Sequence, residues 1–562
     1  MFKRISMLRK LNYIITLAAV VVMGSCSKST FDINNDPNNP TSLSAKVLLP
    51  QIIKNMGDAS TISTGISDVL EVYVHRMSVR EAPNAYGVTG SSGYVESMWD
   101  PYYSRAITNL NIIIDRSATD GNLRYAGISK VLKAFIFSQL VDVFGDVPFS
   151  EAGKLGESIL NPVFDDDATI YPALFAMIDE GIADLKNTTP NPINPGADDL
   201  FYGGNVTKWV KLANTLKLKL YTQQRKVTDV KAEVQALLAS PSTLLSSTAD
   251  NFQLPYTSDN RNPGYSDYGA AQRTGYISPW FYEIMKGYNQ NIFTGNPDPR
   301  TSYYWFNQLT PTQGATNDGN PLEYRDGPFV SIYFGSNGAN SGFTQQSTMS
   351  LLGIYPVGGK FDDEKGSNPR LSASSSTGAA PYRFITYADR LYLEAELIQT
   401  GVVTGDARAV TLAAVKESFK MVDAVVKMTG VPNVPVLAGT DEANTYTDEV
   451  MAEYDANPSK QLQIIMTQKW ISSFGSAIDA YSDYRRTGFP IIWDPNNPAM
   501  APGGSVQPPV NGNPLVDPQP KVPVSANRDF PVSLPWPTSE LDVNANAPAQ
   551  KTPSTYKVFW QP

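Results

Sequence analysis

The two residue types with the widest range of site chemistry are almost missing from this chain. Its 562 residues include one histidine, His75, and one cysteine, Cys26. A zinc site of the Cys/His type needs three or four such ligands, so the composition excludes one. A disulfide within one chain is impossible, and a histidine-based catalytic triad could use only His75. His75 lies in a helical pattern beside Arg76, and we expect a surface or capping histidine there.

Carboxylates, in contrast, are plentiful. The chain has 54 Asp and Glu residues, so a pair suited to glycoside hydrolysis can always be drawn and its presence decides nothing. The run Asp165-Asp166-Asp167 offers oxygen ligands of the kind that calcium takes. Because a helical pattern begins soon after it, we favour a helix cap, where acidic side chains complement the helix dipole. We predict no metal site, no cofactor and no catalytic residue.

Aromatic side chains supply a different chemistry. They gather in a first stretch around residues 86–99 and in a second around residues 265–306. Aromatic faces bind the apolar faces of sugar rings, and neighbouring amides such as Asn307 can reach sugar hydroxyls. The alternative for each ring is that it packs the protein's own core, above all for Trp99 at a helix start. The candidate ligand-binding residues are Tyr86, Tyr94, Tyr276, Trp280, Tyr303 and Trp305.

Helical segments must position these stretches. Apolar residues recur at three- and four-residue spacing in residues 45–56, 66–79, 99–114, 123–144, 171–185, 206–221, 387–399, 407–428 and 462–474. Residues 247–380 are instead rich in Gly, Asn, Ser, Pro and Tyr, with weak helical periodicity apart from 278–286. A long loop-rich insertion of this kind is usually functional. We predict a mainly α fold, a helical-repeat scaffold of helix pairs with a loop-rich lobe over about residues 247–380.

The N-terminus reads as an export signal. A basic start at residues 3–10 precedes an apolar stretch over 11–23, shorter than the roughly 20 residues that span a bilayer. Residues 1–25 are therefore predicted to be a secretory signal peptide. Met23-Gly24-Ser25-Cys26 resembles a lipobox, which implies that the thiol of Cys26 is acylated and that this residue starts the mature chain. Acyl chains would hold the protein at a membrane, with residues 26–44 as tether and 45–562 as the binding domain.

The net charge of the chain restricts the kinds of ligand that it can bind. The formal net charge is −9, which argues against a nucleic-acid ligand, because phosphate neutralisation needs an excess of Lys and Arg. After Cys26 no apolar run reaches transmembrane length. We expect a soluble body held at a membrane surface by its lipid anchor.

Several motifs, in order along the chain, resemble those of the SusD/RagB nutrient-binding outer-membrane lipoproteins. They cover nearly the whole mature sequence and comprise Ile33–Thr41, Asp142–Ala152, Asp199–Gly204 with Lys208-Trp209 and Ala213–Lys219, Asp298-Pro299-Arg300, Thr386–Asp389 with Glu394–Glu396, Asp483–Pro490, and Pro531–Asn546. Gly204-Asn205 replaces the family's Gly-Asp, and Lys219 replaces its Arg.

This resemblance implies a tetratricopeptide-like helical fold without catalysis. It implies a lid on a SusC-like TonB-dependent outer-membrane barrel, capturing a glycan (oligosaccharide) or peptide at the cell surface. Most motif residues have structural explanations: we expect Asp142 in a loop or cap, Trp209 in the core, and Arg485-Arg486 in a structural ion pair or against the partner barrel. Two other functions stay open, an extracellular glycosidase and a helical-repeat scaffold or adhesin.

Overall fold

The structure covers most of the chain. It is a computed structural model and describes residues 44–154, 157–188, 193–269, 275–310, 323–336, 348–366, 375–494, 497, 500 and 528–562. The predicted signal peptide (1–25), the predicted lipidation site Cys26 and all but the end of the predicted tether (26–44) lie outside the described residues. Residues Leu49–Pro562 group into one unit.

Helices dominate the fold. The α-helices are α2 (Ala45–Ser60), α3 (Ser67–Tyr73), α4 (Gly93–Asp100), α5 (Thr108–Asp120), α6 (Leu123–Phe144), α7 (Asp167–Leu185), α8 (Val206–Gln224), α9 (Lys231–Leu238), α10 (Pro279–Met285), α11 (Thr301–Tyr304), α12 (Ile354–Val357), α13 (Tyr387–Gln399), α14 (Ala407–Thr429), α15 (Asp441–Ala456), α16 (Gln461–Ser472), α17 (Ala477–Thr487) and α18 (Thr538–Val543). Shorter helical turns are η2 (Asn84–Tyr86), the π-helix η3 (Pro101–Ile107), η5 (Pro241–Thr243), η6 (Thr248–Asp250), η7 (Pro263–Tyr268) and η9 (Pro458–Lys460).

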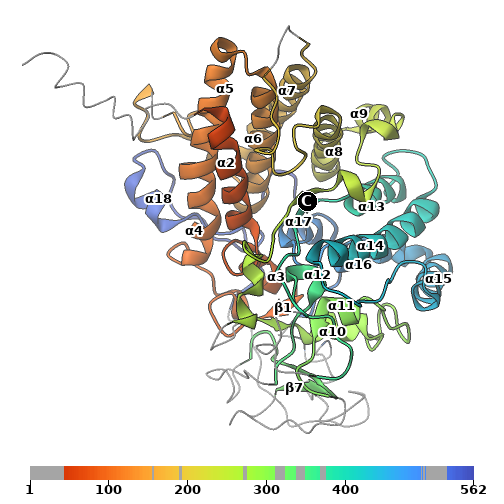
Figure 1. The fold of residues 1–562 in the computed structure, drawn as a ribbon. Coiled ribbons are helices and arrows are strands. Elements are labelled where there is room, and N and C mark those ends of the chain that lie inside the picture. Colours follow the sequence, from red (N-terminus) through yellow and green to blue (C-terminus); the bar gives the residue numbers. More distant parts are fainter. Residues whose placement is uncertain are drawn as a thin grey trace, which may run out of the picture. The chain divides into compact units, whose positions relative to one another are not determined.

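Helices that follow one another in the chain pack together, as α5 with α6, α6 with α7, α7 with α8 and α13 with α14. Figure 1 shows α5, α6 and α7 side by side in orange tones. Gly127 and Gly181 mark a close approach of α6 and α7, because a Cβ atom on Gly127 would lie 2.7 Å from the carbonyl oxygen of Gly181. The prediction of a mainly α fold built from packed helix pairs is confirmed.

Where local signals are strong, the predicted helices match the structure. The spans 123–144 and 387–399 correspond to α6 and α13. A capping box starts α13: the backbone N–H of Asp389 donates to the Thr386 side chain at 3.2 Å, and the Thr386 N–H donates to the Asp389 carboxylate at 2.8 Å. The helices α15 and α17 were not predicted.

The predicted helix over residues 66–79 is wrong at its C-terminal end. Helix α3 stops at Tyr73, His75 takes a left-handed φ of 58°, and Met77–Ser78 forms strand β1. The cause lies far away in the sequence, because β1 pairs with residues 276–277, Met77 opposite Ile277. The predicted helix over 99–114 is also divided, since Pro101 starts the π-helix η3 between α4 and α5.

Short antiparallel strand pairs form the sheet structure of the described residues. They are β1 (Met77–Ser78) with β5 (Tyr276–Ile277), β2 (Val147–Pro148) with β3 (Phe164–Asp165), β4 (Phe252–Leu254) with β10 (Tyr382–Ile385), β6 (Trp305–Phe306) with β9 (Leu351–Leu352), and β7 (Tyr324–Asp326) with β8 (Phe329–Ser331). Most strands of these pairs lie in the predicted loop-rich lobe. In Figure 1, α10, α11 and β7 lie together and away from α6 and α7.

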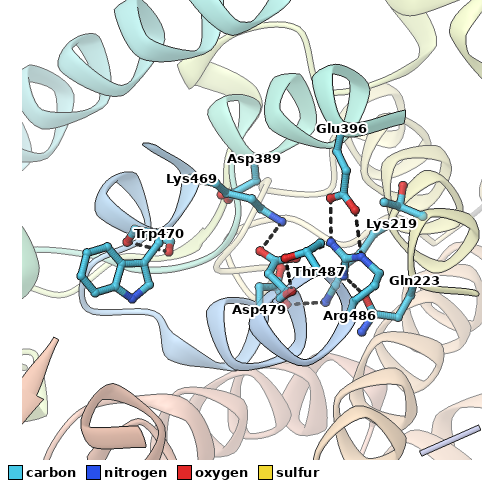
Figure 2. Close-up of polar contacts among 12 residues, drawn as sticks. Lys219, Gln223, Asp389, Glu396, Lys469, Trp470, Asp479, Arg486 and Thr487 are labelled. Carbon is cyan, nitrogen blue, oxygen red and sulfur yellow. Dashed lines mark hydrogen bonds and ion pairs between the residues drawn. The ribbon is translucent and has the colours of Figure 1, made fainter. Parts of the chain in front are cut away.

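A buried group of charges joins the helices α8, α13, α16 and α17. Arg486 donates from Nε to Glu396 Oε1 at 2.9 Å and from Nη2 to Glu396 Oε2 at 2.7 Å. Arg486 Nη2 also lies 2.6 Å from Asp483 Oδ1, and Lys469 Nζ lies 2.8 Å from Asp483 Oδ2. Arg225, at the end of α8, lies 2.8 Å from Glu396. Figure 2 shows Arg486 beside Glu396, with Lys469 and Asp479 near by. We call the five residues of this group the scaffold ion-pair network: Arg225, Glu396, Lys469, Asp483 and Arg486.

The scaffold ion-pair network keeps its acids charged. Burial acts to raise the pKa of Glu396, but Arg486 and Arg225 outweigh it and hold that pKa below its ordinary value. Burial likewise opposes ionisation of Asp483, and Lys469 and Arg486 outweigh it. The structural ion pair expected at Arg486 is therefore confirmed.

Other motif residues are also structural. Arg485 forms no ion pair with a described acid, unlike Arg486. It donates to the carbonyl of Val532 at 2.9 Å, with its guanidinium 3.9 Å from the ring centre of Tyr481. Asp142 was expected in a loop or cap, but it lies within the last turn of α6, where its buried carboxylate accepts the Tyr171 hydroxyl at 2.5 Å. Trp209 is fully buried, as expected for a core residue. In the part of the chain that the structure describes, every helix is too short or too polar to cross a bilayer.

Candidate functional site

The two predicted aromatic stretches meet in space. Strand β1 leads into the first stretch, strand β5 belongs to the second, and Ser78 stands opposite Tyr276 in their antiparallel ladder. The Arg80 guanidinium lies 4.6 Å from the ring centre of Tyr276. Long-range strand pairing thus brings together regions almost 200 residues apart in the sequence.

The six predicted ligand-binding residues nevertheless do not share one cavity. Tyr86 borders a cavity of about 460 Å³ against the C-terminal segment 528–554. Tyr94 borders a smaller one of about 140 Å³, together with Asp68 and Glu81. Trp305 borders a third cavity, of about 360 Å³.

The other three predicted rings pack inside the protein. Tyr276 is fully buried against Arg80. Trp280 donates its indole N–H to the carbonyl of Ile491 at 3.1 Å and borders a space of only about 10 Å³. Tyr303 donates its hydroxyl to the carbonyl of Pro435 at 2.8 Å. Each ring therefore has a packing or hydrogen-bonding role inside the protein.

The cavity beside Trp305 has the most varied chemistry, and we call it the lobe pocket. Its volume is about 360 Å³, within the range of small-molecule sites. Three aromatic rings, three carboxylates, one amide and one ammonium group border it, from Tyr282, Tyr288, Trp305, Asp326, Asp362, Glu364, Asn307 and Lys286. The remaining lining is small or neutral, from Thr301, Ser302, Gly327 and Pro328.

Packing fixes the aromatic wall of the lobe pocket. Tyr282 of α10 stacks on Phe329 of β8, with ring centres 3.7 Å apart and planes 17° apart. Its ring centre lies 5.5 Å from that of Trp305, which β6 holds opposite Leu352 of β9. Tyr282 and Trp305 are almost buried, whereas Tyr288 is only half-buried and is the most accessible of the three rings.

Asp326 stands at the end of β7, beside a two-residue hairpin loop. Gly327 in that loop has φ = 55°, in the left-handed region that glycine adopts without strain. The Asp326 carboxylate accepts the Tyr282 hydroxyl at 2.8 Å and is only 6% exposed. The hydroxyl of Tyr288 also hydrogen-bonds Asp326. The hairpin thus ties one acid of the pocket to two of its rings.

Asp362 is held by a second set of neutral donors. The Asn307 amide donates to Asp362 Oδ2 at 2.6 Å, and the Glu364 backbone N–H donates to Oδ1 at 3.0 Å. The side chain is 6% exposed, and burial raises the pKa of Asp362 to about 6 although these hydrogen bonds act to lower it. Among the described residues, no basic side chain forms an ion pair with Asp362.

Sequence reasoning identified Trp305 and Asn307 in this pocket and missed its charged residues and Tyr288. The missed charged side chains are Lys286, Asp326, Asp362 and Glu364. The Asp326-Gly327 dipeptide is a hairpin signal that could have placed one acid at a strand end. Nothing in the local sequence relates Asp362 to Asn307, because they meet through packing of distant segments.

His75 corrects an expectation. It is fully buried rather than at the surface, with its ring centre 4.4 Å from that of Phe334 and Nε2 3.0 Å from the Tyr86 hydroxyl. Burial lowers the pKa of His75 to about 3, so the imidazole is neutral at physiological pH. The left-handed turn after α3 carries the side chain inward among aromatic rings, which periodicity could not indicate.

Metal binding has no support in the described residues. They contain no group of three or more His, Cys, Asp or Glu side chains able to hold a metal ion. In the acidic run before α7, Asp166 is the N-cap and accepts the Ala168 N–H at 3.0 Å. The capping role predicted for this run is confirmed.

Comparison with solved structures identifies the fold. A SusD homologue from Bacteroides fragilis NCTC 9343 superposes with a TM-score of 0.63 at 20% identity, covering 92% of this chain and 99% of that one. A chitin-binding SusD homologue from Flavobacterium johnsoniae gives 0.61 at 19% identity, covering 91% and 98%. A SusD/RagB family protein from Bacteroides thetaiotaomicron VPI-5482 gives 0.62 at 22% identity, covering 90% and 95%. At these identities the likeness establishes the fold alone.

Sequence comparison identifies the family as well as the fold. A search of curated protein sequences finds no match. Residues 37–509, most of the chain, match the family SusD-like, described as "Starch-binding associating with outer membrane". Most of the motifs that suggested this family lie within these residues, and the closing motif Pro531–Asn546 lies beyond them. The chain therefore belongs to the SusD-like family of nutrient-binding outer-membrane proteins.

Proposed function

We propose that this protein binds an oligosaccharide in the lobe pocket at the surface of the outer membrane and passes it to a SusC-like, TonB-dependent barrel. The supporting observation is the composition of the pocket, where Trp305, Tyr282 and Tyr288 lie beside Asp326 and Asp362 in about 360 Å³. Aromatic faces take the C–H faces of sugar rings, and carboxylates accept hydrogen bonds from sugar hydroxyls. A peptide is the less favoured ligand, because it would leave these acceptors with fewer hydroxyl donors.

Isothermal titration calorimetry with purified protein tests the binding site. Maltohexaose and chitohexaose are suitable probes, since the family description names starch and a structural relative is named as chitin-binding. Tyr288→Ala should weaken binding about 5- to 100-fold, the usual effect of removing a stacking ring. Tyr387→Ala, a half-buried tyrosine that begins α13, is the matched control and should bind like wild type. Equal affinity in Tyr288→Ala and wild type would remove the lobe pocket from the site.

Hydrolysis is the second candidate function, because a carboxyl with a pKa of about 6 beside other carboxylates resembles a general acid. We favour binding without turnover, as the family is described by binding. Prolonged incubation of either oligosaccharide with the protein, followed by mass spectrometry, should return the intact ligand. Cleavage that Asp362→Asn abolishes would establish a glycosidase instead.

Anchoring and delivery need separate tests. The thiol of Cys26, outside the described residues, is the proposed lipid attachment site, so Cys26→Ser should move the protein from the membrane to the soluble fraction. Affinity purification from detergent-solubilised outer membranes should recover a TonB-dependent barrel. Recovery of no such barrel would favour a scaffold or adhesin.

A further inference from the structure

The lobe pocket has an unbalanced charge. Its lining contains three acidic side chains, Asp326, Asp362 and Glu364, and one basic side chain, Lys286. When all four are ionised, the described lining carries two net negative charges. Neutral sugars do not require such an excess, since hydroxyls and amides can supply the same acceptors.

Asp362 is held by neutral donors and not by a basic side chain among the described residues. Its partners are the side-chain amide and backbone N–H of Asn307 and the backbone N–H of Glu364. In the scaffold ion-pair network, by comparison, Glu396 lies within 2.8 Å of both Arg225 and Arg486. The chain thus pairs that buried acid with arginine, whereas Asp362 has neutral donors and borders a cavity.

Glu364 adds to this field from an accessible position. It is exposed, borders the lobe pocket and lies two residues from Asp362 in a loop. The intervening Asp363 is also exposed, but it pairs with Lys365 at 2.9 Å and is not among the residues that border the pocket. Neighbouring acids therefore differ in whether their charge faces the site.

We infer that the lobe pocket selects its ligand by charge, favouring amine-bearing over neutral oligosaccharides and neutral over carboxylate- or sulfate-bearing ones, with Asp362 and Glu364 as the discriminating side chains. This inference rests on the proposed function of the pocket as an oligosaccharide site. A like charge brought near carboxylates in a partly desolvated cavity is repelled, whereas an ammonium group gains their attraction. Selection of this kind works mainly by rejection of the wrong ligand.

Oligosaccharides of one backbone and different charge provide the test. Calorimetry compares maltohexaose with its C6-oxidised carboxylate derivative, and chitohexaose with its de-N-acetylated amine derivative. Wild type should bind the carboxylate derivative at least about tenfold more weakly than maltohexaose, and the amine derivative more tightly than chitohexaose. At 1 M NaCl both ratios of charged to neutral affinity should move toward one, because salt screens the interaction between the ligand charge and the carboxylates.

Charge-neutralising variants identify the residues responsible. In the double variant Asp362→Asn, Glu364→Gln, the ratio of charged to neutral affinity should approach one, whatever happens to the neutral affinity itself. Asp363→Asn removes one negative charge between these positions and should leave both ratios as in wild type. Circular dichroism of each variant confirms that the fold is retained.

The outcomes separate the two proposals. In one outcome, neutral oligosaccharides bind, Tyr288→Ala lowers their affinity, and the charged derivatives bind as tightly as the neutral ones. That result would refute the charge selection but support the lobe pocket as the binding site. The charge selection would also be refuted if the double variant left the ratios of charged to neutral affinity unchanged, or if Asp363→Asn shifted them as strongly. If neither maltohexaose nor chitohexaose binds, the assignment of the pocket as an oligosaccharide site fails, and this inference fails with it.

Discussion

The scaffold ion-pair network and the lobe pocket treat buried acids in opposite ways. In the network, Arg225 and Arg486 hold the pKa of Glu396 below its ordinary value against the effect of burial. In the pocket, burial raises the pKa of Asp362 to about 6, because only neutral groups donate to it. The network stabilises the folded protein when it is charged, whereas the charge of Asp362 costs stability. The proposed charge selection of the lobe pocket would give that costly charge a role in ligand binding.

The largest effect is expected from breaking the network. Arg486→Gln leaves Glu396 and Asp483 buried with less compensation, and it should lower the free energy of unfolding by about 3–5 kcal/mol. Urea denaturation followed by circular dichroism measures this. Arg408→Gln, which removes an exposed pair 2.6 Å from Asp455, is the control and should leave the denaturation midpoint unchanged. A loss in Arg486→Gln no larger than in this control would show that the network is not stabilising.

A smaller change in the free energy of unfolding, of opposite sign, is expected when Asp362 of the lobe pocket is neutralised. The pKa of Asp362 is raised from 3.8 to about 6, so folding favours its protonated form, and this preference is lost as pH rises through that range. Asp362→Asn should therefore be more stable than wild type by up to about 3 kcal/mol at pH 8, and this advantage should disappear near pH 3. Urea denaturation at both pH values measures it. An advantage that is largest at pH 3 would contradict the buried, uncompensated charge.

The smallest expected effects are on ligand affinity, and they distinguish two tryptophans that were both predicted to bind the ligand. Trp305 borders the lobe pocket, while Trp280 borders a space of about 10 Å³ and donates to Ile491. Trp305→Ala should weaken maltohexaose or chitohexaose binding by about 1–3 kcal/mol, and Trp280→Ala by less. Calorimetry on variants with native circular dichroism spectra measures both. The reverse order would place the site on the other side of α10.

Much of the helical scaffold could be predicted from the sequence, because its signals are local. The recurring apolar residues of α6 and the Thr386–Asp389 capping box of α13 lie within or next to the helices that they define. The family, too, could be recognised from motifs whose residues Asp142, Trp209 and Arg486 hold the scaffold together.

The site could be predicted only in part. Both aromatic stretches were recognised from composition, yet of the six rings chosen Trp305 alone borders the lobe pocket. Whether a tyrosine or tryptophan faces a cavity or a neighbouring ring depends on residues far away in the chain, as with Tyr303 and the carbonyl of Pro435. The same holds for His75, whose pattern indicated a helix surface.

The sequence by itself thus determined the helical scaffold, the family and the near absence of histidine and cysteine chemistry, because periodicity, capping and composition act within short segments. Only the tertiary structure decided that β1 pairs with β5, that His75 turns inward, and that Asp326 and Asp362 border one cavity with Trp305. These outcomes depend on long-range packing and on the local dielectric environment, which no short stretch of sequence contains.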